Sequence, residues 1–184
     1  MVAVASSSSS SLPKPPSALL LSPPPSCACS SPPHPRSLSV VWLLPMDALR
    51  KAEADGIIDL TIFEQILEMD DDEDHEFSIE IINSFYDQAE TTFGDMDKAI
   101  EKKDIAELSQ LGHFLKGSSA AVGVVRVKDI CEKIQNLGHQ LDESGKKPIE
   151  VDTALEAITK LLPEVKEEYQ KCKIVLKEFY SQYV

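Results

Sequence analysis

The chain has 184 residues and a formal net charge of −13, from 31 acidic and 18 basic residues. This length suits about one domain of ordinary size and an additional segment. All the acidic residues lie at or after Asp47, so the later part of the chain carries the excess negative charge. Such a domain repels phosphate backbones and anionic lipid headgroups, which argues against nucleic acid and membrane surfaces as partners. It favours a partner with a basic rim.

The first 45 residues are rich in serine and proline and contain no Asp or Glu. Proline removes backbone donors, and the apolar pieces are too short to form a core, so we predict a disordered tail. The composition resembles an organelle transit peptide, but Arg36 is the tail's only arginine, whereas such peptides are rich in arginine. No stretch of the chain approaches the roughly 20 apolar residues of a membrane span. We therefore predict a tail over residues 1–45 and a folded domain over residues 46–184.

A short helix is predicted over residues 59–70, DLTIFEQILEMD, because its apolar residues repeat at helical spacing. Asp59 or Thr61 can cap its first turn. The acidic run DDDEDHE follows. It lacks the glycine and the terminal glutamate of a calcium loop, so we interpret it as a solvated connection and not as an ion site.

Four longer helical segments follow this connection. Residues 77–103 carry apolar side chains three and four positions apart, and Asp104 can cap a next helix that ends near Gly123. Further helices are predicted over residues 126–143 and 151–180, separated by the turn ESGKKP, with Pro163 kinking or restarting the last helix. No segment alternates like a strand. We therefore predict an all-α antiparallel four-helix bundle, with the short first helix packed on one end.

The four cysteines give no metal-binding pattern. Cys27 and Cys29 lie in the tail, and Cys131 and Cys172 lie in separate helical segments. There is no CxxC pair and no matching histidine spacing, so a zinc site is disfavoured. We expect Cys131 and Cys172 to be buried, reduced thiols.

The segment GHFLKGSSAAVG, residues 112–123, places a histidine among small side chains. At ~100° per residue, His113 lies roughly 140° from the centre of the apolar face of its helix, so we expect it to face solvent. Lys116, one turn away, can offset the charge of a phosphoryl group on the imidazole. Gly117 opens space for a docking partner, although it costs about 1 kcal/mol in helix propensity relative to alanine. A lone exposed histidine is more often ordinary surface, and spacing alone leaves that alternative open.

The run HFLKGSSAAVG, followed by RVKDICEKIQNLG, resembles the histidine-containing phosphotransfer (HPt) domain, and specifically the fungal phosphorelay intermediates. TIFEQILEMDDDED and FYDQAETTFGDMDKAI are similar to the same family, so the resemblance covers residues 57–143 closely. It implies a four-helix bundle that accepts a phosphoryl group from the receiver-domain aspartate of a hybrid histidine kinase and passes it to a response regulator. By position, the resemblance makes His113 the phosphorylated residue, Lys116 its charge partner and Gly117 the cleared approach. It also implies that Gln135 forms a hydrogen bond near the imidazole.

Exposed apolar and small residues around His113 are candidates for partner docking, namely Phe114, Ala120 and Ala121. The same positions could equally be ordinary surface of a small bundle. His139 is a further candidate, because the family pattern continues QNLGR and has a basic residue where this chain has His139. This departure leaves less certain positive charge near the phosphoryl group. The tail has no counterpart in the family.

The chain has no nucleotide-binding glycine motif and no carboxylate cluster suited to magnesium beside His113. We therefore expect a phosphohistidine carrier without ATP-dependent kinase activity and without a cofactor of its own, since the partner receiver domain would supply Mg²⁺. The resemblance implies a monomer in the cytoplasm and nucleus. Two alternatives remain. One is a helical binding module that docks receiver domains without transfer, and the other is a hydrolase, which would need a local acid and a water-excluding pocket.

Overall fold

The computed structural model describes residues 43–184 except residues 72, 73, 182 and 184. This part of the chain contains no strand and has six helices: α1 (Leu43–Ala54), α2 (Leu60–Leu67), α3 (Glu76–Lys102), α4 (Ile105–Ala121), α5 (Val125–Gly138) and α6 (Val151–Tyr180). The predicted tail over residues 1–45 lies outside the described residues except at its end, where α1 begins before the predicted boundary at Met46.

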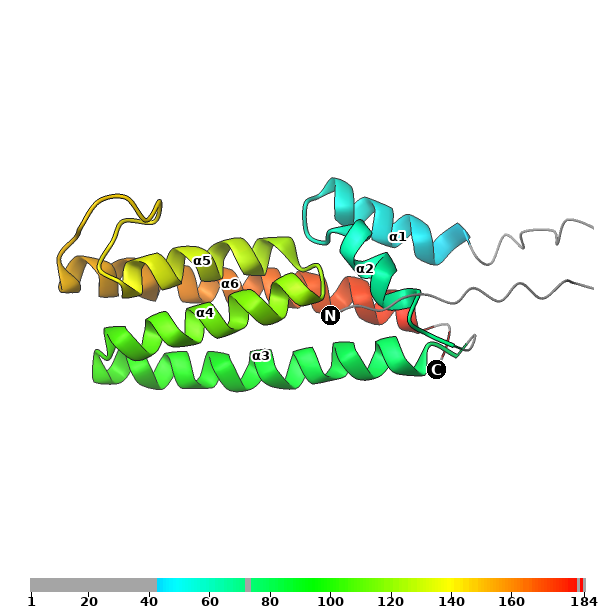
Figure 1. Cartoon of the computed structure of the whole chain (residues 1–184), viewed down its shortest axis with the longest axis horizontal. Coiled ribbons are helices and arrows are strands. Elements are labelled where there is room, and N and C mark those ends of the chain that lie inside the picture. The colour runs from blue at the N-terminus through cyan, green and yellow to red at the C-terminus, as the bar shows by residue number, and fades with distance from the viewer. Residues whose placement is uncertain (1–42, 72–73, 182, 184) are drawn as a thin grey trace, which may run out of the picture. The chain divides into compact units, whose positions relative to one another are not determined.

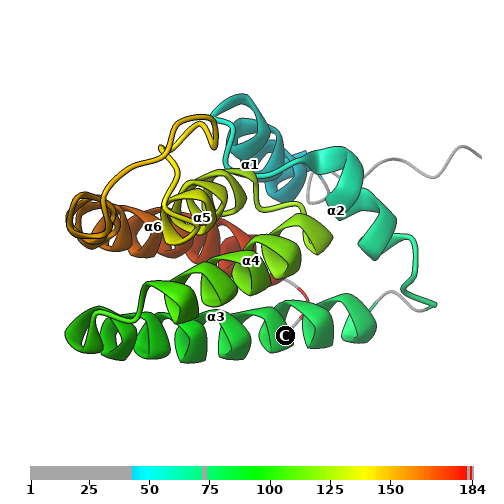
Figure 2. The same cartoon turned by 60° about the vertical axis from the view of Figure 1, so that its left-hand side comes forward.

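Helices α3 to α6 form an antiparallel four-helix bundle, and α1 and α2 lie together at one end of it (Figure 1, Figure 2). Helix α4 packs between α3 and α5, and α6 packs against both α3 and α5. The predicted all-α bundle is therefore confirmed. Helix α1, which the sequence analysis did not predict, packs mainly on α6 and contributes Leu49 and Ala52 to the core. None of the described helices has the length and apolar character that a membrane span needs.

The predicted helix caps at Asp59 and Asp104 are both present. The Asp59 carboxylate accepts hydrogen bonds from the backbone N–H groups of Thr61 and Ile62 at 3.1 and 3.4 Å. The Asp104 carboxylate accepts one from the N–H of Glu107 at 3.0 Å. These side chains satisfy donors that the first helical turn leaves unpaired, and they fix where α2 and α4 begin.

The turn between α4 and α5 is held by the segment that joins α1 to α2. The backbone N–H of Asp59 donates to the carbonyl of Gly123 at 2.7 Å, and the N–H of Val125 donates to the carbonyl of Ile57 at 3.0 Å. Gly123 has a φ of 77° and ends α4, as predicted, and a Cβ here would lie 2.8 Å from the Asp59 carbonyl oxygen. The C-terminal end of α4 is therefore fixed from two sides.

Three predictions about helix ends and continuity differ from the structure. Helix α2 ends at Leu67 and not at residue 70. Helix α6 continues through Pro163 without a break. Pro163 is exposed, while Leu161, Leu162 and Val165 beside it are buried, so core packing holds both sides of the proline. Helix α5 ends at Gly138 and not at residue 143. Gln140 has a φ of 59°, and this left-handed backbone turns the chain out of the helix.

Candidate functional site

His113 lies on the solvent-exposed face of α4. The opposite face packs in the bundle through Leu108, Gly112, Leu115 and Ser119, which are all buried. The predicted orientation of the histidine is therefore confirmed. The ring projects from a helix that is anchored along its length.

Helices α4 and α5 approach closely in the turn of α4 that comes directly before His113. A Cβ on Gly112 would lie 3.0 Å from the backbone nitrogen of Gln135 and 3.1 Å from the carbonyl oxygen of Cys131. Near the end of α5, a Cβ on Gly138 would lie 2.5 Å from the Cβ of Ser109. Ser109, whose hydroxyl donates to the carbonyl of Gln135 at 3.2 Å, ties the two helices together. His113 thus stands on a tightly packed helix pair.

The space one turn beyond His113 is open. Gly117 is exposed, and a Cβ added to it would meet no atom of the described residues within 4 Å. A glycine in a helix destabilises it relative to alanine, and here no close contact inside the molecule requires it. The position therefore leaves room for a group from outside the molecule.

Lys116 lies beside the same face and reaches toward α5. Its Nζ atom is 4.0 Å from Oε1 of Glu132, and its side chain is 28% exposed. At this distance and exposure the ion pair is weak, so the ammonium can move to a stronger anion. Glu132 was not predicted as a site residue, because a pairing between two helices depends on how they cross and has no local pattern.

Gln135 and His139 both belong to the end of α5. Gln135 is half-buried, and its Oε1 atom is buried without a hydrogen-bond partner among the described residues. Its predicted hydrogen bond near the imidazole stays a prediction. His139 is exposed at the C-cap of α5, directly after Gly138, which contacts α4 one turn before His113. The structure thus brings the two residues to the α5 side of the site.

Apolar surface lies on the other side of His113, toward α3. Phe114 is 51% exposed, Ala121 is exposed and Ala120 is half-buried. A groove of about 480 Å³ runs between α3 and α4, lined by Phe77, Glu80, Ile81, Ser84, Phe85, Gln88, Ser118, Ala121 and Val122. The Ser118 hydroxyl donates to Oε1 of Gln88 at 3.1 Å across this groove. Ala121 was predicted from the sequence, whereas the α3 wall of the groove was not, because that wall depends on the packing of two helices.

The described cysteines and acids form no metal site. Cys131 and Cys172 are free and buried, as predicted, and burial raises the pKa of each thiol to about 12. Both thiols therefore stay protonated near neutral pH and are poor nucleophiles. Within the described ranges no three His, Cys, Asp or Glu side chains are grouped so that they could hold a metal ion.

Comparison with known proteins identifies the family. The Hpt domain model matches residues 80–168. Multistep phosphorelay regulator 1 of Schizosaccharomyces pombe is 46% identical over 128 residues, which are 68% of this chain and 43% of that protein. Phosphorelay intermediate protein YPD1 of Saccharomyces cerevisiae is 51% identical over 87 residues, 47% of this chain and 52% of that protein. The chain therefore spans about half the length of the curated relatives it matches.

A solved structure of a phosphorelay protein also matches this chain, and the match covers nearly the whole of that protein's chain. In the co-crystal structure of Saccharomyces cerevisiae Ypd1 with the receiver domain of its downstream response regulator Ssk1, the matched chain is 37% identical with a TM-score of 0.61. The match covers 70% of this chain and 97% of that one. The bundle, the exposed histidine and these matches lead to one conclusion. The chain belongs to the Hpt domain family.

Proposed function

We propose that this chain is a histidine phosphotransfer protein of a multistep phosphorelay. His113 accepts a phosphoryl group from the receiver-domain aspartate of a hybrid histidine kinase and passes it to the aspartate of a response regulator. The observation that carries the proposal is the exposed His113 beside the open space at Gly117. The co-crystal of the relative Ypd1 with the Ssk1 receiver domain supports receiver domains as the partner class.

The transfer is a displacement at phosphorus. A neutral imidazole nitrogen of His113 attacks the phosphorus of the aspartyl phosphate in line, the N–P bond forms, and the P–O bond to the carboxylate breaks. The aspartate leaves as a carboxylate, and the second ring nitrogen of the imidazole keeps its proton. The reverse sequence delivers the phosphoryl group to the next aspartate. We infer that the receiver brings the Mg²⁺ and that the chain has no ATP-dependent kinase activity of its own.

Lys116 supplies positive charge to the phosphorylated state. In the free chain its ammonium faces Glu132 at 4.0 Å. A phosphoryl group on His113 carries more negative charge and offers three oxygens, so Lys116 moves toward it and away from Glu132. The weak ion pair with Glu132 is lost in this movement.

The receiver docks over the apolar groove between α3 and α4. Phe77, Ile81 and Ala121 line this groove, and Phe114 is exposed beside His113. Burial of exposed aromatic and aliphatic side chains drives association, and the acids around them favour a receiver with a basic rim. For the whole protein we propose a monomer that acts in the cytoplasm and the nucleus.

The test is incubation of the chain with a ³²P-labelled phosphorylated receiver domain and Mg²⁺, followed by location of the label. We expect an acid-labile, base-stable phosphate on His113. His113→Gln should abolish labelling while circular dichroism shows an unchanged helical bundle, because the side chain is exposed.

The matched control is His34→Gln, which removes a histidine from the N-terminal segment and should leave labelling unchanged. Label that persists in the His113→Gln variant would show that the phosphoryl group resides elsewhere. A wild-type chain that binds the receiver but never acquires label would instead be a binding module without transfer chemistry.

A further inference from the structure

The connection between α2 and α3 contains a buried carboxylate, that of Asp70, within a run of acidic residues. The side chain of Asp70 is only 3% exposed, so the interpretation of this run as a solvated connection is wrong at its first residue. One oxygen of Asp70 accepts the backbone N–H of Ser78 at 2.8 Å, inside the first turn of α3. The other oxygen accepts from Nδ1 of His75, also at 2.8 Å. Asp70 therefore joins the end of α2 to the start of α3.

His75 has a backbone conformation that needs outside support. Its φ of 54° and ψ of 28° lie in the left-handed region, which costs a non-glycine residue of order 1 kcal/mol. Among the described residues, its ring contacts the Asp70 carboxylate, the Tyr183 ring in a T-shaped arrangement with centroids 4.3 Å apart, and the Phe179 ring with centroids 6.4 Å apart. The two aromatic rings come from the end of α6 and the residues after it. The left-handed turn is thus held between two distant parts of the chain.

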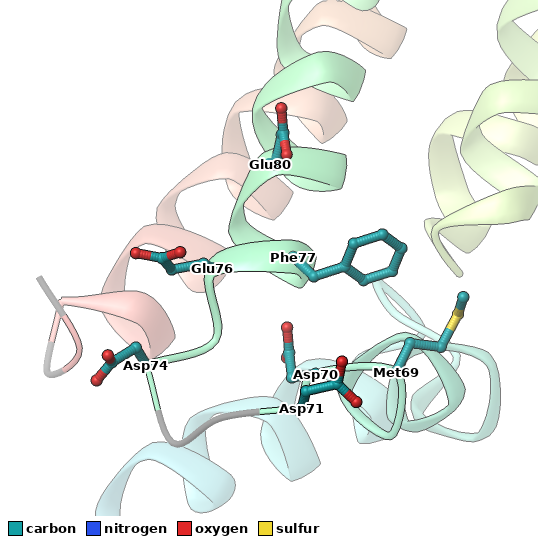
Figure 3. A pocket seen from close by; sticks show the side chains of 7 residues that line it. All are labelled: Met69, Asp70, Asp71, Asp74, Glu76, Phe77 and Glu80. Atoms are coloured by element: carbon teal, nitrogen blue, oxygen red, sulfur yellow. The ribbon is translucent and has the colours of Figure 1, made fainter.

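The residues beside this turn are exposed and apolar. Met69, directly before Asp70, is 58% exposed, and Phe77, two residues after His75, is 43% exposed. Both line a pocket of about 660 Å³ whose other walls are Asp70, Asp71, Asp74, Glu76 and Glu80. Figure 3 shows Met69 and Phe77 on one side of this pocket, with Asp74 and Glu76 on the other. Phe77 also lines the groove between α3 and α4, so its ring borders both the pocket and the groove.

The geometry of this turn couples it to the site. Asp70 adjoins Met69, and His75 lies two residues before Phe77, so the Asp70–His75 hydrogen bond and the packing of the His75 ring against Tyr183 both hold the backbone that carries these apolar side chains. We propose that Asp70, His75 and Tyr183 form a positioning joint that orders Met69 and Phe77 for receiver docking. This inference rests on the proposed phosphotransfer function. It assigns to Tyr183, which follows α6, a part in receiver affinity without a part in the chemistry at His113.

The test separates docking from chemistry. Tyr183→Leu removes the ring that contacts His75, and we expect it to raise the KM for a phosphorylated receiver by about five- to tenfold, as loss of an ordered apolar anchor does. The kcat at saturating receiver, and the labelling of His113 by the small phosphodonor phosphoramidate, should stay at wild-type values. Tyr183→Phe keeps the ring and should restore the wild-type KM.

Two further variants complete the design. His75→Asn preserves the left-handed backbone and an amide donor for Asp70 but removes the ring, so it should raise the KM like Tyr183→Leu, and it serves if that variant does not fold. Ile174→Ala alters an exposed apolar residue of α6 and should change nothing. Wild-type KM values for both Tyr183→Leu and His75→Asn, or a fall in kcat with no change in KM, would overturn the joint. A wild-type chain that takes no label on His113 would overturn the phosphotransfer proposal and the joint's functional role with it.

Discussion

Gly117 and Gly94 both lie inside helices, and a methyl group added at either position would meet no atom within 4 Å in the part of the chain that the structure describes. We expect Gly117→Ala to raise the free energy of unfolding by about 0.5–1 kcal/mol, because alanine loses less backbone freedom in a helix than glycine. The same change should slow transfer from a receiver, because the methyl group stands beside His113 in the approach. Urea unfolding and the transfer rate measure the two effects.

Gly94→Ala is the matched control, because α3 offers the same open surroundings away from His113. It should stabilise the bundle by a similar amount and leave the transfer rate unchanged. Equal transfer rates for both variants and the wild type would remove the docking role from Gly117.

The single-residue features of the site divide into those that a helical wheel can predict and those that it cannot. The exposure of His113 and the burial of Leu108 and Leu115 follow from angular position on one helix, and the structure confirms them. The Lys116–Glu132 contact does not follow from any single helix. It requires the crossing of α4 and α5, which close backbone approach at Gly112 permits.

At the scale of helices, α4 and α5 pack at a distance that excludes a side chain at Gly138 and leaves a tight fit for one at Gly112. A Cβ on Gly138 would lie 2.5 to 2.7 Å from three atoms of Ser109, two of them in the backbone. We expect Gly138→Ala to lower the free energy of unfolding by about 1–3 kcal/mol, because the backbones must separate. The measurement is the urea midpoint at an unchanged m-value.

A graded series makes this expectation sharper. Gly112→Ala meets its nearest atoms at 3.0 to 3.2 Å, so it should destabilise less than Gly138→Ala, and Gly94→Ala should not destabilise at all. If Gly138→Ala were as stable as the wild type, the two helices would not be in close contact at that end.

Some helix boundaries follow from the local sequence, and others depend on contacts that form only in the folded bundle. The helix caps depend on side chains next to the helix, so the sequence predicted Asp104 directly and Asp59 as one of two candidates, with Thr61 the other. Pro163 suggested a kink or restart in the last helix, but burial on both sides of the proline keeps α6 continuous. The burial of Asp70 could not be predicted from the acidic run, because its hydrogen-bond partners, Ser78 and His75, reach it only in the folded turn.

The hydrogen bonds of Asp70 explain why this buried carboxyl group stays ionised. Burial acts to raise the pKa of Asp70, but hydrogen bonds from His75 and Ser78 outweigh it and hold that pKa below its ordinary value. A lowered carboxyl pKa stabilises the folded state above the unfolded pKa, and this stabilisation is lost as pH falls through the folded pKa. The Asp70 carboxylate is therefore ionised at neutral pH, where it accepts the hydrogen bonds from Ser78 and His75.

For the molecule as a whole, the uneven charge should govern how a receiver arrives. The chain carries a net charge of −13, and Glu80 lines both the pocket and the groove that Phe77 borders. We expect the association rate constant with a receiver domain, measured by stopped-flow fluorescence, to fall as ionic strength rises, while the dissociation rate changes much less, because screening weakens long-range steering. Glu80→Gln should flatten this salt dependence more than Glu164→Gln, which removes an exposed charge on α6. An association rate constant that does not change with ionic strength, or that rises with it, would show that electrostatic steering does not speed receiver binding.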